Sequence, residues 1–161
     1  MLSISLFFLT HFLFITPSIL ALFQLKYSFL GEILLVLAWV ARKYAPSYYK
    51  SILLLNADNL NNTYCQIEMA LQYESGYAMF PKDAERAHYW MRRAATNVNS
   101  FEEDLTEAQY HYARYWELGI GCEQPSDKEA CNWMQKAAQN YHPEALQFIE
   151  RRQRSLVFRN V

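Results

Sequence analysis

The fold of this chain is indicated most clearly by two similar stretches, ERAHYWMRRAATN (residues 85–97) and KEACNWMQKAAQN (residues 128–140). They lie 43 residues apart and share Ala, Trp, Met, a double Ala and a final Asn in one register. Comparing 64–97 with 107–140 without gaps gives ten identities in 34 positions, where chance gives about two. The identical pairs are Gln66/Gln109, Ala70/Ala113, Glu74/Glu117, Gly76/Gly119, Ala87/Ala130, Trp90/Trp133, Met91/Met134, Ala94/Ala137, Ala95/Ala138 and Asn97/Asn140. The chain therefore contains an internal repeat.

Each repeat unit predicts two helices joined by a loop. Apolar residues recur at three- and four-residue intervals in both halves of each unit, as one face of a helix requires. A helix pair of this size cannot bury both of its faces alone, so neighbouring pairs are expected to stack. The expected helices are 62–75 and 84–98 in the first unit (62–98), and 101–118 and 127–140 in the second unit (101–140).

Short-range signals mark the ends of these helices. Ser100 and Ser126 are each followed three residues later by a glutamate, which is the spacing of an N-terminal capping box. Asp83 is suited to cap the helix that follows it. Gly76 and Gly119 are expected to close the first helix of each unit in a left-handed conformation.

The repeat core is predicted from small residues that let helices approach and aromatic residues that fill the space beside them. The predicted core residues are Ala70, Tyr73, Gly76, Ala87, Trp90 and Ala94 in the first unit, and Ala113, Trp116, Gly119, Ala130, Trp133 and Ala137 in the second.

This pattern resembles the Sel-one-like repeat, a short relative of the tetratricopeptide repeat. Its units read A-x-x-x-L/Y-G/A-x-x-Y/W-x-x-G-x-G and then K/E-A-x-x-W-x-x-K/R-A-A. The second unit matches at Ala108, Tyr112, Ala113, Trp116, Gly119, Gly121, Ala130, Trp133, Lys136, Ala137 and Ala138. The first unit departs at Ala78, which stands where the pattern has its second glycine. The resemblance covers about half of the chain, residues 62–145, and implies a binding surface for proteins or peptides.

A third unit begins at HPEALQFIERRQR and is expected to form a capping helix over 143–155. The predicted fold is all-α: a short right-handed α-solenoid of two helix-pair repeats plus this capping helix, preceded by one or two N-terminal transmembrane helices. Three parts follow: a membrane anchor (1–43), a connecting helix and turn (44–61) and a repeat domain (62–161).

The N-terminus has the composition of a membrane segment. The first 25 residues contain no Asp, Glu, Lys or Arg, and residues 2–25 are long enough to span a hydrocarbon core of about 30 Å. A cleaved signal peptide is the alternative, but no basic residue precedes the apolar run and no A-x-A site follows it. We expect an uncleaved span.

A second apolar run, 29–41, is interrupted by Glu32. At about 1.5 Å per residue it is short for a full crossing, so it is either a short second span or an interfacial helix. Arg42, Lys43 and Lys50 follow it, and excess basic charge belongs on the cytoplasmic side. The repeat domain is therefore expected at the cytoplasmic face of a bacterial inner membrane.

Charge and motif content disfavour several function classes. The part after Lys43 carries 15 acidic and 12 basic residues, which is no footprint for nucleic acid. We find no catalytic triad, no glycine-rich phosphate loop and no paired carboxylates in an apolar pocket, so no enzyme activity and no cofactor are expected. His88, His111 and His142 lack the spacing of a metal site.

The remaining function is binding. Exposed polar and aromatic positions on the first helix of the second unit are the candidate partner contacts: Tyr110, His111, Arg114 and Tyr115. We expect a membrane-anchored adaptor or scaffold that binds another protein or peptide and contacts the bilayer through its N-terminal segment. The alternative is an exported or periplasmic envelope repeat protein that organises secretion or surface components, with Cys122 bonded to Cys131. The resembled family's stapled pattern places its two cysteines in the two helices of one unit, which neither unit here does.

Overall fold

The computed structural model describes residues 30–76 and 79–159, and all regular elements of this part are helices. Residues 30–44 are helical and lead into a short turn at Ala45. The helices that follow are α2 (Pro46–Asp58), α3 (Thr63–Ser75), α4 (Ala84–Ala95), α5 (Glu102–Leu118), α6 (Asp127–Gln139) and α7 (Pro143–Arg159).

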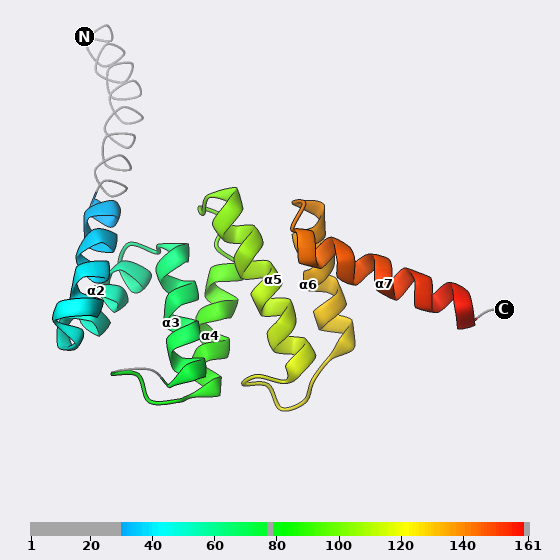
Figure 1. Cartoon of the computed structure of the whole chain (residues 1–161), viewed down its shortest axis with the longest axis horizontal. Coiled ribbons are helices and arrows are strands. Elements are labelled where there is room, and N and C mark those ends of the chain that lie inside the picture. The colour runs from blue at the N-terminus through cyan, green and yellow to red at the C-terminus, as the bar shows by residue number, and fades with distance from the viewer. Residues whose placement is uncertain (1–29, 77–78, 160–161) are drawn as a thin grey trace, which may run out of the picture.

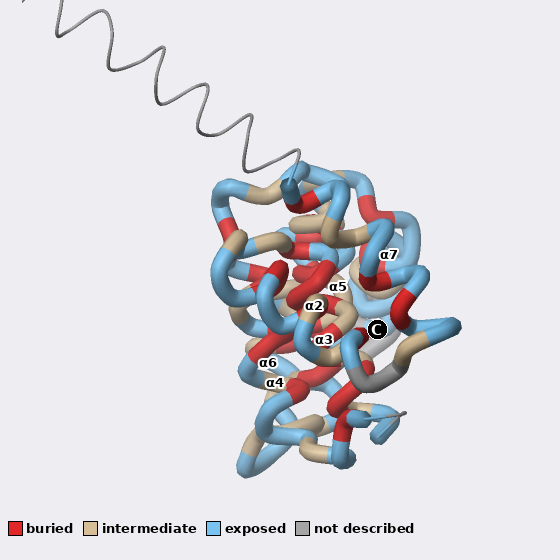
Figure 2. The backbone as a smooth tube through the Cα atoms, turned by 90° about the vertical axis from the view of Figure 1, so that its left-hand side faces the viewer, coloured by how far each residue is buried: buried red, intermediate tan, exposed pale blue. Residues whose placement is uncertain are grey.

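Each of these helices packs on the next one along the chain, and α3 also contacts α5 (Figure 1). The stack runs from the helical segment 30–44 and α2 at one end of the molecule to α7 at the other. Buried residues lie along the inner sides of the helices and exposed residues on the outside (Figure 2). The predicted all-α helical repeat is confirmed, and the capping helix is one turn longer than expected.

Two of the three predicted N-terminal caps are confirmed. The side chain of Asp83 accepts a hydrogen bond from the Arg86 amide, and the hydroxyl of Ser126 accepts one from the Glu129 amide. The cap at Ser100 is wrong. Helix α5 begins after Phe101, and the Ser100 hydroxyl is buried with no hydrogen-bond partner among the described residues.

Both predicted glycine caps are confirmed. Gly76 ends α3 with φ 72° and Gly119 ends α5 with φ 73°, which are left-handed conformations. A residue with a Cβ is strained there, because its side chain approaches the neighbouring carbonyl. Each glycine amide donates to the carbonyl four residues earlier, which satisfies an acceptor at the end of its helix.

The predicted core alanines and Trp90 are buried, as is Tyr73. Trp116 and Trp133 differ, because they are only partly buried. Both still pack against the main core. Trp133 packs against both the main core and a smaller cluster around Ala137 and Ala145.

The predicted span, 2–25, lies outside the described residues. Residues 30–41 of the second apolar run belong to the helical segment 30–44. This segment buries Ala38 and Ala41 in the same core as Tyr49 and Leu53 of α2. Asn56 of α2 donates a hydrogen bond to the Gly31 carbonyl at 3.3 Å. Within residues 30–76 and 79–159, no helix is both long enough and apolar enough to cross a bilayer.

Candidate partner-binding surface

Helices α3 and α5 present equivalent positions on one face of the stack. Positions 68, 71 and 75 of α3 correspond, 43 residues later, to positions 111, 114 and 118 of α5. A groove of about 780 Å³, here called the α3–α5 groove, lies between α3 and the end of α5 with the loop that follows it. Its lining includes Glu68, Leu71, Gln72, Ser75, Leu118 and Ile120.

Glu68 organises the α3 side of this groove. Its Oε1 accepts hydrogen bonds from Arg42 Nη1 at 3.0 Å, Tyr49 Oη at 2.8 Å and Gln72 Nε2 at 2.8 Å. Burial raises the pKa of Tyr49, and the hydrogen bond to the Glu68 carboxylate raises that pKa further. The carboxylate therefore joins the helical segment 30–44, α2 and α3, and its first role is structural.

The four predicted contact residues of α5 do not share one environment. Arg114 is exposed, and His111 is half-buried with its Nε2 3.0 Å from Glu107 Oε1. Tyr110 is half-buried and stacks on His142, with ring centroids 4.2 Å apart. His111 and Arg114 therefore lie on the surface, while Tyr110 belongs to the contact between α5 and α7.

Tyr115 needs a correction, because it is 2% exposed and does not reach a partner. Its hydroxyl donates a 2.8 Å hydrogen bond to Glu74 Oε2 of the neighbouring repeat. Burial raises the pKa of Tyr115, and the Glu74 carboxylate raises that pKa further. Tyr115 is a packing residue between α3 and α5.

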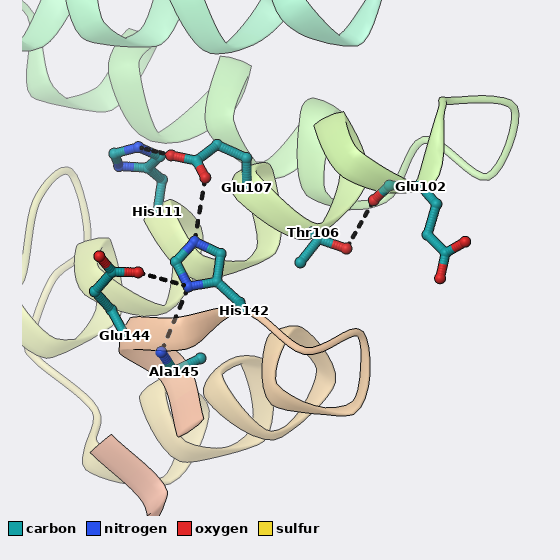
Figure 3. A network of polar contacts seen from close by, with 7 residues as sticks. All are labelled: Glu102, Thr106, Glu107, His111, His142, Glu144 and Ala145. Carbon is teal, nitrogen blue, oxygen red and sulfur yellow. Dashed lines mark hydrogen bonds and ion pairs between the residues drawn. The ribbon is translucent and has the colours of Figure 1, made fainter. Parts of the chain in front are cut away.

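His142 holds the start of α7 against α5 (Figure 3). Its Nε2 lies 3.1 Å from Glu107 Oε2, and its Nδ1 lies 3.4 Å from the Ala145 amide nitrogen and 3.3 Å from Glu144 Oε2. Glu107 is thereby shared between His142 and His111. The arrangement caps α7 through a side chain that also bonds the neighbouring repeat.

His88 and Cys122 form the nearest approach to a nucleophile and base in the described residues, with Cys122 Sγ 3.8 Å from His88 Nδ1. His88 Nδ1 donates a hydrogen bond to the Ile120 carbonyl at 3.0 Å, so His88 Nε2 accepts one from Tyr112 Oη at 3.3 Å. Burial lowers the pKa of His88 and raises the pKa of the Cys122 thiol. A nucleophilic cysteine needs a lowered pKa, so this pair is arranged for packing rather than for attack.

None of the four predicted contact residues lines the α3–α5 groove, and Glu68 and Leu71, which do line it, were not predicted as a site. The 43-residue offset places Glu68 and Leu71 at the positions equivalent to His111 and Arg114, which is the signal that could have identified them. Within the described part of the chain, no group of three or more His, Cys, Asp or Glu residues is placed to hold a metal ion.

Stacked helix pairs with a groove between equivalent helices define an α-helical repeat protein. The family model of the Sel1 repeat matches residues 63–99 and 106–142, which are the two units described above. The chain is a Sel1 repeat protein with two repeats. Sel1 repeats are typically non-catalytic and generally bind proteins.

A solved structure supports the same fold. The crystal structure of a Sel1 repeat protein from Oxalobacter formigenes is similar to this chain with a TM-score of 0.59 and 22% sequence identity. The similarity covers 78% of this chain and 96% of that one. No curated protein matches the sequence.

Proposed function

We propose that this protein is a membrane-anchored adaptor whose α3–α5 groove binds an extended segment of another protein. The observation that carries the proposal is the groove itself, which is about 780 Å³ and is lined by residues of both repeats. Leu118 in its lining is 55% exposed, so its apolar surface is available to a partner. A groove between repeats is the surface that stacked helix pairs offer for binding.

The chemistry of the groove suits a peptide with mixed side chains. Leu71 and Leu118 supply apolar contacts, while Ser75 and Lys82 supply polar ones. A bound segment that carries both apolar and polar side chains fits this lining.

The anchor is proposed from residues 2–25, which contain no charged residue. Arg42, Lys43 and Lys50 follow the apolar sequence and favour the cytoplasmic face of a bacterial inner membrane. Cys65, Cys122 and Cys131 are free thiols, which agrees with a reducing compartment. Labelling intact cells with a membrane-impermeant thiol reagent tests this side: we expect no reaction at the half-exposed Cys122, and labelling of Cys122 would place the repeats outside.

The binding role is tested by capture from detergent-solubilised membranes on the full chain. Leu118→Glu introduces a charge into the α3–α5 groove, and Val98→Glu introduces the same charge at an 86% exposed position outside the groove lining. We expect proteins recovered by the unmodified chain to be lost with Leu118→Glu and retained with Val98→Glu. Equal recovery with both variants would contradict binding in this groove.

A further inference from the structure

The exposed apolar residues of this protein are concentrated at its N-terminal end. Ten of the eighteen large hydrophobic residues exposed in the described chain lie between positions 30 and 55. They are Leu30, Ile33, Val36, Leu37, Trp39, Val40, Tyr44, Tyr48, Leu54 and Leu55. An exposed apolar patch of this extent marks an interaction surface.

The helical segment 30–44 buries one side and exposes the rest. Gly31, Ala38 and Ala41 are buried toward α2. One exposed stripe follows the spacing i, i+3, i+7, i+10, i+14, from Leu30 to Tyr44 through Ile33, Leu37 and Val40. A second exposed stripe, here called the Val36 stripe, contains Val36 and Trp39. Apolar residues therefore cover most of the helix perimeter that the protein leaves open.

We propose that this open perimeter lies in the lipid of the membrane interface, with the segment 30–44 parallel to the bilayer plane. A single partner helix covers one apolar stripe of about 100°, whereas lipid covers the whole open perimeter. The preceding residues 2–25 carry no charge and need the same surroundings. The proposal rests on the proposed membrane anchor but concerns different residues.

Charged and aromatic residues frame the apolar perimeter as an interfacial helix requires. Lys43 lies at its C-terminal end, where its charge suits the phosphates of anionic lipids. Arg42 and Lys50 donate instead to Glu68 and to the Met79 carbonyl. Trp39 and Tyr44 are exposed at the same end, where amphipathic rings fit the headgroup region. Glu32 lies away from this end, in the lining of a cavity that it shares with Asp104 of α5.

The Val36 stripe connects this perimeter to the partner-binding surface. Val36 and Trp39 line an apolar cavity of about 370 Å³ whose lining also includes Arg42 and Glu68. The same Arg42 and Glu68 line the α3–α5 groove. A partner in the groove would therefore be held next to the bilayer surface instead of at the end of a loose tether.

Spin labelling of the full chain in vesicles of phosphatidylethanolamine and phosphatidylglycerol tests the proposal. Cysteine is introduced singly at Val36, Val40 or Val98 in a chain that also carries Cys122→Ser and Cys131→Ser. Val98 is the control, because it is 86% exposed and lies in the α4–α5 loop. Collision rates with oxygen, which enters lipid, and with a polar nickel chelate, which does not, are measured at each label.

We expect labels at positions 36 and 40 to be reached by oxygen and shielded from nickel, and the label at 98 to show the opposite. Vesicle flotation of the same samples reports the anchor separately. A chain that floats while the labels at 36 and 40 meet nickel as readily as the label at 98 would overturn this inference and leave the anchor standing. A chain that fails to float would overturn both. Dipolar broadening between labels at position 40 of two copies would assign the face to a dimer and overturn the lipid contact.

Discussion

At the scale of single residues, Gly121 shows why the second repeat keeps two glycines in its loop. Its φ is 67°, and a Cβ placed on it would lie 2.1 Å from the carbonyl oxygen of Ala84. The same Cβ would lie 2.7 Å from the Cβ of His88. The backbone of the loop after α5 therefore packs directly against the start of α4, which joins the two repeats.

Gly121→Ala is expected to destabilise the fold by about 2–4 kcal/mol, since it adds a backbone clash to a left-handed conformation. Gly31→Ala is the matched control, because its added Cβ meets nothing closer than 3.7 Å within a helix. That change should be neutral or stabilising by up to about 1 kcal/mol. Thermal unfolding of both variants measures the difference, and equal stability would contradict the close contact.

His88 predicts a pH dependence of stability. Because burial lowers its pKa in the folded state, the folded protein favours the neutral ring. The resulting stabilisation is complete above about pH 6.5, the unfolded value, and is lost as the pH falls through the lower folded value. In denaturant unfolding at pH 7 and pH 5, the stability advantage of the unmodified chain over His88→Gln should shrink at the lower pH. An advantage that is constant over this range would show that His88 does not titrate as described.

Most residue-level predictions with a local cause succeeded. Asp83, Ser126, Gly76 and Gly119 act on backbone groups within a few positions, so spacing identifies them. Ser100 has the same spacing as Ser126 and failed, because α5 begins after Phe101. Tyr115 failed because its burial depends on Glu74 in the other repeat, which no local pattern reveals.

At the scale of helices, α6 holds the C-terminal end of the stack together through Trp133. The indole packs against both core clusters, and its centroid lies 5.0 Å from the Tyr112 ring of α5. Lys136 Nζ lies 3.5 Å from the ring centroid on α6 itself. Trp133 therefore joins α5, α6 and the cluster beneath α7.

Trp133→Ala should cost about 3 kcal/mol, the low end for a truncated tryptophan because the side chain is only partly buried. The loss falls on α6 and α7, because Trp133 packs against the small cluster to which both of these helices contribute. Hydrogen exchange should accelerate in these two helices and remain slow in α3 and α4. Gln135→Ala, at an exposed position of the same helix, should leave exchange unchanged. Uniform acceleration across all helices would contradict the local role.

Helix positions were predictable because the 43-residue repeat shows each boundary twice. The role of residues 30–44 was not, because their apolar composition suits a membrane, an interface and a protein core equally. Ala38 and Ala41 are buried beside α2, so one side of this helix faces the protein and the other does not. This difference is visible only in the folded structure.

At the scale of the whole molecule, two Sel1 repeats, α7 and the N-terminal helices form one stack with a groove along it. The sequence predicts the stack but not the groove, because none of Tyr110, His111, Arg114 and Tyr115 belongs to its lining. The groove depends on how α3 packs beside the end of α5, and that contact joins different repeats. The sequence does not identify the partner, because a groove of mixed polarity binds peptides of many different sequences.

Site-specific photocrosslinking in cells directly tests whether a partner protein binds in the α3–α5 groove. A photoreactive phenylalanine analogue is placed at Leu118, which lines the α3–α5 groove, or at Gln135, which is exposed on α6 outside that lining. We expect a discrete crosslinked protein from position 118 and none from position 135. A crosslinked protein obtained from position 135 but not from position 118 would contradict binding in the groove.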